Sequence, residues 1–145
     1  MTGYLHKIGA IFYILWGVLH VGFGALVLYR LAADGGTAAL AQIGTAVPRS
    51  QLPAQLPDVA SGVLAQHAWN LIVFGVFAVV VACIWNWRNS RTGYWLNLGV
   101  VSGADLAFLC AIVIPRFDTL VDGLAGPILW VLAATFSTLG IATKR

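Results

Sequence analysis

The sequence predicts an all-α integral membrane protein, a four-helix up-down bundle, and three observations lead to this fold class. First, 60% of the 145 residues are hydrophobic and 9% are charged, whereas about a quarter are charged in soluble domains. Second, the apolar residues form four stretches, each long enough to cross a hydrocarbon core of ~30 Å at a rise of ~1.5 Å per residue. Third, none of the eight Lys and Arg residues lies deep within such a stretch. We therefore expect residues 1–145 to form a single transmembrane domain.

The first predicted helix covers residues 8–31. We expect it to be retained, because its apolar length exceeds the ~7–15 residues of a signal-peptide core. Gly17, His20 and Gly24 follow the spacing i, i+3 and i+7, so they share one helical face. The two glycines expose the backbone there, which would let another helix approach the imidazole of His20.

Residues 32–62 form the one long loop, rich in Ala, Gly, Gln and Ser. Residues 37–47 within it could form a short amphipathic helix on the membrane surface. The proline-spaced segment that follows should be extended. A long loop in so small a protein is either functional or a tether.

The second predicted helix covers residues 63–85, and its first turns are polar on one side. His67 and Asn70 share this face, with Trp69 beside them. Together with Trp130, expected at a similar depth on the fourth helix, they could line a mouth leading from the outer face toward His20. The open alternative is that they are interfacial residues that meet headgroups and water.

The third predicted helix covers residues 94–114 and carries a polar face. Gly99 and Gly103 have the GxxxG spacing typical of close helix packing. Ser102 lies about one turn before Asp105, and Pro115 should end the helix.

Asp105 lies at the middle of this third helix, where a charged side chain costs ~2.5–3.5 kcal/mol. We therefore expect a partner, and His20 is the best candidate. His20 precedes Arg30 by ten residues, and Asp105 precedes Arg116 by eleven. If both arginines mark the same membrane face, the two groups share a depth.

The fourth predicted helix covers residues 120–142 and contains Pro127. Either the helix begins at Pro127 and is short, or Pro127 kinks a longer helix. We favour the kink, because a helix beginning at Pro127 would be short for a bilayer core.

The basic residues predict the orientation. One side has basic residues and no acids, whereas the other mixes Arg30, Arg49 and Arg116 with aspartates. The positive-inside rule then places both termini in the cytoplasm, which we expect for an inner-membrane protein. The net charge of +3 reflects these loop charges, so no nucleic-acid partner is expected. The unopposed basic residues are Lys7, Arg88, Arg91, Lys144 and Arg145.

The pair of His20 and Asp105 has two interpretations. It could handle a proton or orient a ligand at the membrane midplane, with Asp105 fixing the imidazole tautomer. If the protein is an enzyme, His20 would be the catalytic base and Asp105 the residue that orients it. Alternatively, the pair only holds two helices together. The predicted ligand-binding residues are His20, Asp105, Ser102, His67, Asn70, Trp69 and Trp130.

No cofactor or metal is expected. Haem ligation by His20 and His67 is disfavoured because their expected depths differ by roughly 10 Å. Zinc is disfavoured because at most three ligands are at hand, spread over that same depth. Cys83 and Cys110 lie near opposite membrane faces, too far apart for a disulfide.

The four spans, the GxxH stripe from Gly17 to His20 and the polar third helix resemble small bacterial inner-membrane proteins of the DoxX-like type. This resemblance covers the chain in outline and brings no activity or site residue with it. A His and an acid in a membrane cavity are also similar to the chemistry of emopamil-binding-type sterol isomerases, which have five spans.

The sequence therefore favours a protein that binds, or binds and transports, a small hydrophobic or weakly polar molecule or a proton. Two alternatives remain open: an acid/base enzyme of isomerase type acting on a lipidic substrate, and a structural subunit of a larger membrane complex. The expected partners are the lipid bilayer, a small hydrophobic ligand, and further copies of the chain or other membrane subunits.

Overall fold

The computed structural model describes residues 4–143, and within that range it is helical with no strand. Four helices are long and apolar enough to cross a membrane, which confirms the all-α class and the four long apolar helices. Lys144 and Arg145, which the orientation argument used, lie outside the described residues. The four helices cover Leu5–Asp34, Asp58–Arg88, Arg91–Val113 and Leu120–Ala142.

The central helix, α1 (Leu5–Asp34), packs along both α3 (Asp58–Ile84) and α6 (Ala125–Ala142). Glycines allow the close approach to α3. A Cβ atom at Gly17 would lie 2.5 Å from the carbonyl oxygen of Gly75, and one at Gly24 would lie 2.6 Å from that of Ala68. A methyl group at either position would overlap the α3 backbone, so the predicted glycine stripe of α1 faces α3.

The predicted GxxxG pair lies on α4 (Arg91–Phe108) but packs against no other helix of the described chain. Gly99 and Gly103 are both exposed, and no atom of residues 4–143 lies within 4 Å of a Cβ placed on either. The short 3₁₀ turn Asn86–Arg88 connects α3 to α4.

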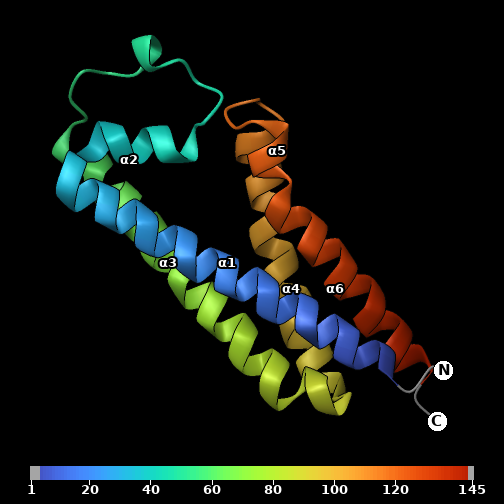
Figure 1. Cartoon of the computed structure of the whole chain (residues 1–145). Coiled ribbons are helices and arrows are strands. Elements are labelled where there is room, and N and C mark those ends of the chain that lie inside the picture. Colours follow the sequence, from blue (N-terminus) through green and yellow to red (C-terminus); the bar gives the residue numbers. More distant parts are fainter. Residues whose placement is uncertain (1–3, 144–145) are drawn as a thin grey trace.

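The long helices pack together near the chain termini and diverge toward the short helix α2 (Gly36–Ile43), as Figure 1 shows. One arm consists of α2 with the adjoining halves of α1 and α3. The other arm consists of α5 (Leu120–Gly123) with the adjoining parts of α4 and α6.

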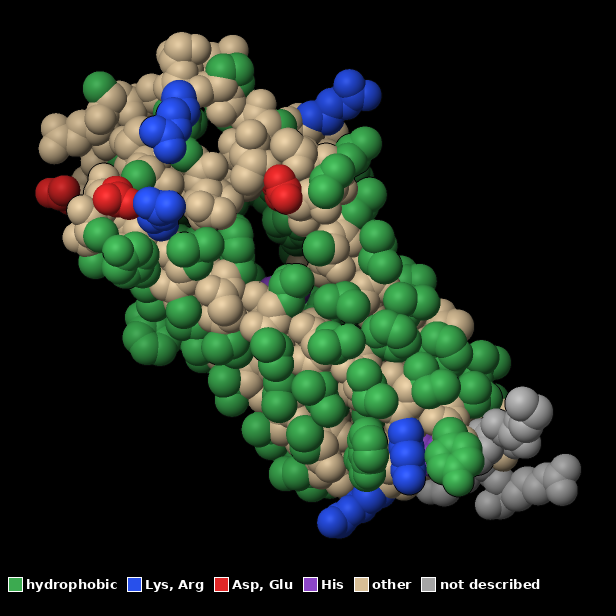
Figure 2. All heavy atoms as spheres, viewed as in Figure 1, with side chains coloured by type: hydrophobic (Ala, Val, Ile, Leu, Met, Phe, Trp, Pro, Cys, Tyr) green, Lys and Arg blue, Asp and Glu red, His purple; other side chains and the backbone are tan. Residues whose placement is uncertain are grey.

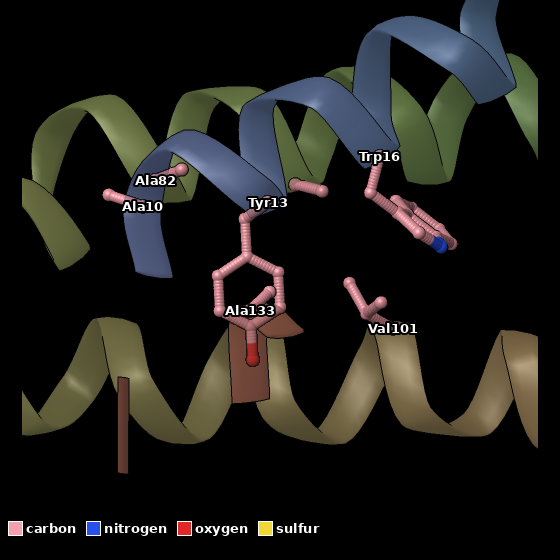
Figure 3. Packing of buried hydrophobic residues seen from close by; sticks show 7 residues of the cluster. Ala10, Tyr13, Trp16, Ala82, Val101 and Ala133 are labelled. Carbon is pink, nitrogen blue, oxygen red and sulfur yellow. The ribbon is translucent and has the colours of Figure 1, made fainter. Parts of the chain in front are cut away.

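Two clusters of buried apolar side chains hold the molecule together. The terminal cluster lies near the chain termini, where Tyr13 and Trp16 point from α1 toward Val101 and Ala133 (Figure 3). The α2 cluster lies beneath α2, and Ile112 packs against it from the other arm. Its buried members are Val27, Ala39, Ile43 and Ala68.

After Phe108 the α4 helix continues as one π-helical segment, Leu109–Val113. The backbone N–H of Ile114 donates to the carbonyl of Leu109 at 2.8 Å, the i to i+5 pattern of such a segment. Single π-helical turns are frequent beside functional sites. This one begins four residues after Asp105.

The last span, Leu120–Ala142, is longer than a helix beginning at Pro127, in agreement with the favoured alternative in which Pro127 lies inside a longer helix. The last span is broken earlier, at Leu124, which separates α5 from α6. Pro127 is the third residue of α6, where a backbone N–H would have no partner within the helix. The missing N–H of proline therefore costs little at this position.

The segment after α2 joins the two arms through a set of hydrogen bonds that we call the latch. The hydroxyl of Thr45 donates to the carboxylate of Asp118. The N–H of Ala46 donates to the carbonyl of Phe117, and the N–H of Thr119 donates to the Thr45 hydroxyl, both at 3.2 Å. The short helix predicted at residues 37–47 is thus present as Gly36–Ile43, and a 3₁₀ turn, Arg49–Gln51, interrupts the segment expected to be extended.

Candidate functional site

The buried carboxylate of Asp105 has a direct hydrogen-bond donor from α1. Asp105 is 1% exposed, and the indole Nε1 of Trp16 donates to its Oδ2 at 2.7 Å. Trp16 is itself fully buried. A carboxylate removed from water needs such a donor. The expectation that His20 is the hydrogen-bond partner of Asp105 is therefore wrong, and the partner is Trp16.

His20 lies over the face of the Trp16 indole. The two rings are stacked with centroids 3.7 Å apart. Nδ1 of His20 lies 2.8 Å from the backbone carbonyl of Trp16, and because a carbonyl only accepts, Nδ1 carries the proton in this bond. Nε2 of the neutral ring is then a hydrogen-bond acceptor. Trp16 thus orients both groups of the predicted pair.

His20 and Asp105 converge on Gly126, at the start of α6. A Cβ atom at Gly126 would lie 3.2 Å from Cε1 and 3.8 Å from Nε2 of His20, and 3.3 Å from Oδ1 of Asp105. The two side chains thus lie at one level along the long helices, as the spacing from the arginines predicts. Within residues 4–143, neither Oδ1 nor Nε2 receives a hydrogen bond.

This polar site lies between the two apolar clusters. Along α1, His20 comes one turn after Trp16 of the terminal cluster and seven residues before Val27 of the α2 cluster. Both of those residues are fully buried, whereas His20 is only half-buried. Figure 2 shows the surface hollowed between the two arms below α2, with a histidine side chain at the edge of the hollow. The burial of side chains along α1 is thus interrupted at the level of the site.

Ser102 and Trp130 form a second polar contact, closer to the chain termini. The indole Nε1 of Trp130 donates to the hydroxyl of Ser102 at 2.9 Å, which joins α6 to α4. Trp130 also packs against the terminal cluster. This bond lies about one helical turn from Asp105, so both residues support the site from one side.

The other three predicted residues, His67, Trp69 and Asn70, lie on α3. His67 is half-buried and precedes Ala68 of the α2 cluster. Trp69 is 57% exposed, and Asn70 is also exposed. The expectation that Trp130 shares a depth with His67 is wrong, because Trp130 contacts the terminal cluster. The exposure of Trp69 and Asn70 is typical of residues that meet lipid or headgroups.

Metal ligands do not gather in the described part of the chain. No group of three or more His, Cys, Asp and Glu side chains is arranged to hold an ion within residues 4–143. Cys83 and Cys110 are both exposed free thiols.

Two residues of this site, Trp16 and Gly126, were missed by the sequence reasoning. Trp16 had a usable signal, since it lies well inside an apolar span, away from the interfaces where tryptophan is enriched, and one turn before His20. Gly126 had no such signal, because its role depends on how α6 crosses the other helices. Comparisons with protein-family models, with curated proteins and with solved structures found no match.

Proposed function

We propose that this chain is a multi-pass membrane protein that binds a small, mostly apolar molecule through a hydrogen-bond donor placed between His20 and Asp105. The observation that carries this proposal is that two acceptor atoms, Nε2 of His20 and Oδ1 of Asp105, converge beside Gly126, which has no side chain. Two acceptors that lie close to one position are best satisfied by a donor placed there. That donor is either a water molecule or the O–H group of a ligand.

A role as a helix clamp does not account for this arrangement. The bond from Trp16 to Asp105 already joins α1 to α4, and the bond from Trp130 to Ser102 joins α6 to α4. Nε2 of His20 adds nothing to either contact. A buried polar group that only held helices together could be replaced by apolar packing at little cost. Because apolar clusters flank the site on both sides, the rest of the ligand should be apolar.

We also propose that the α2 end of the bundle faces the outside of an inner membrane and that both termini are cytoplasmic. The charges support this orientation. In Figure 2 the visible acidic side chains lie only near the α2 end, whereas basic side chains lie at both ends. Cytoplasmic flanks of membrane helices carry an excess of Lys and Arg.

The proposal can be tested with two photoreactive probes in lipid nanodiscs: a long-chain alcohol and its methyl ether. The ether has nearly the same apolar length but no donor. Since one hydrogen bond contributes about 1.4 kcal/mol, the alcohol should label the purified protein with about tenfold higher affinity. Equal labelling by the two probes would contradict the proposal and favour the structural-subunit alternative.

Gly126→Ala gives a steric version of this test. The added methyl group would lie within 3.3 Å of both His20 and Asp105 and should weaken labelling by the alcohol. Gly22→Ala on α1 is the matched control, because no atom of residues 4–143 lies within 4 Å of its Cβ position. Both variants should fold, since alanine is a better helix former than glycine. Unchanged labelling of Gly126→Ala would place the ligand elsewhere.

An acid/base enzyme is the second candidate, and one observation favours it. The bond from Nδ1 to the Trp16 carbonyl holds the unprotonated Nε2 toward the space beside Asp105, as a general base would require. Chromatographic separation of lipids incubated with the protein and with His20→Gln, followed by fragmentation mass spectrometry, would reveal an isomerised product of unchanged mass. A product formed only by the unaltered protein would favour catalysis over binding.

A further inference from the structure

The polar site is closed along the axis of the bundle on the side of the chain termini. Tyr13, Trp16 and Val101 of the terminal cluster are all 0% exposed. They come from α1 and α4, the helices that also supply His20 and Asp105. A ligand therefore cannot reach the site from this end without separating the helices.

The site is also closed along the axis toward α2. Val27, Ala39 and Ala68 are 0% exposed, and Ile112 packs against them from the opposite arm. The latch between Thr45 and Asp118 lies across the same end and joins the two arms by hydrogen bonds. Apolar packing and the latch together separate the site from the water on this side.

The flank of the bundle is the remaining direction. Figure 2 shows the hollow on this flank, between the two arms, where the four long helices would face lipid. Hydrophobic side chains cover most of the surface below α2 in the same view. His20, at the level between the two clusters, is only half-buried.

We propose that the ligand is a membrane-dissolved amphiphile with one hydroxyl group, and that it enters sideways from the bilayer, between the two arms. The inference rests on the proposed binding function of the site and adds the class of ligand and its route. The hydroxyl group lies between Nε2 of His20 and Oδ1 of Asp105, where it donates to one of the two acceptors. The apolar part of the molecule extends through the hollow into the half of the bilayer nearest α2. A water-soluble molecule has no comparable path.

A covalent latch tests this route. The Thr45 hydroxyl and the Asp118 carboxylate are in direct contact, so these two positions are chosen for an engineered disulfide, whose formation is checked by the loss of free thiols. The pair Thr45→Cys/Asp118→Cys is made in a background with Cys83→Ala and Cys110→Ala, then oxidised after reconstitution into nanodiscs. The photoreactive long-chain alcohol, dissolved in the lipid, should label the oxidised and reduced forms at rates within about twofold. If oxidation slows labelling about tenfold or more, the ligand passes under α2 and the proposed route is wrong.

A second probe and a control make the result specific. A short, water-soluble photoreactive alcohol should label the site poorly in both redox states, and preferential labelling by this probe would overturn the proposed ligand class. The single variant Thr45→Cys, treated with the same oxidant, controls for oxidative damage. If the long-chain alcohol labels the unaltered protein no better than its methyl ether, the binding function itself fails. If it does label better but the oxidised latch prevents labelling, only the lateral route fails.

Discussion

Replacing Trp16 by phenylalanine should reveal how strongly the polar site is anchored. Trp16→Phe removes the indole N–H that donates to Oδ2 of Asp105 at 2.7 Å. The aromatic ring remains available to stack on His20, and the backbone carbonyl that accepts from His20 is unchanged. The substitution therefore isolates one hydrogen bond from the rest of the site.

The expected magnitude follows from burial and from the nature of the acceptor. Side-chain hydrogen bonds between membrane helices contribute ~0.6 kcal/mol on average and up to ~1.7 kcal/mol. The acceptor here is a carboxyl group that is 1% exposed, which places the bond in the upper part of that range. We expect a coupling free energy of about 1–1.7 kcal/mol between Trp16 and Asp105.

A double-mutant cycle of Trp16→Phe with Asp105→Leu measures this coupling, because the volume lost on truncating the indole cancels in the cycle. Leucine has a similar size to aspartate but no acceptor. Unfolding is followed by circular dichroism in mixed micelles of increasing denaturing-detergent content. The control cycle, Trp130→Phe with Ser102→Ala, removes an indole bond of 2.9 Å to a neutral hydroxyl and should give about 0.5 kcal/mol.

Additivity of the first pair within about 0.3 kcal/mol would refute the bond between Trp16 and Asp105. The cycle of His20→Ala with Asp105→Asn should show a smaller coupling than that of Trp16 with Asp105. The reason is that His20 and Asp105 share no hydrogen bond with each other in the described chain and are linked through Trp16. A larger coupling for this second cycle would restore the direct contact that the sequence suggested.

The packing of α1 against α3 and the orientation of the chain give two further predictions. Gly17→Val should lower the free energy of unfolding by about 1–3 kcal/mol through overpacking against α3, whereas Gly22→Val, with open space around it, should change it by less than about 0.5 kcal/mol. Similar values for both would contradict the close helix approach. A membrane-impermeant thiol reagent should label Gln51→Cys from outside intact cells and should not label Thr92→Cys, in a background without the native cysteines. The reverse pattern would invert the proposed orientation.

The sequence predicted the four long helices because a bilayer leaves the chain few choices. Backbone polar groups must be satisfied within each span, so apolar length alone identifies helices. The shared level of His20 and Asp105 was predictable for a related reason, since the helix rise converts counts from Arg30 and Arg116 into depths. Depth says nothing about direction around the helix, however. This is why Trp16, one turn from His20 on the same side of α1, was not recognised as the partner of Asp105.

Features that depend on how the helices cross could not be predicted from the sequence. The GxxxG spacing of Gly99 and Gly103 does not say which face of α4 packs within the chain, and the structure leaves both glycines exposed. The close approach occurs instead between Gly17 of α1 and Gly75 of α3. Because these glycines belong to different helices, no spacing within one helix identifies them as a pair. The interruption at Leu124 lies three residues before Pro127, in the turn that a proline within a helix disturbs.

The central claim is that His20 and Asp105 hold a donor group of a ligand between them, and the most direct test is a density map of the protein purified in nanodiscs of its native lipids. The account predicts elongated density that begins between Nε2 of His20 and Oδ1 of Asp105 beside Gly126 and continues into the lipid between the two arms. It also predicts that this density is lost in Gly126→Ala and kept in Gly22→Ala. Arms closed upon each other, with apolar side chains filling the space beside His20 in the unaltered protein, would contradict it.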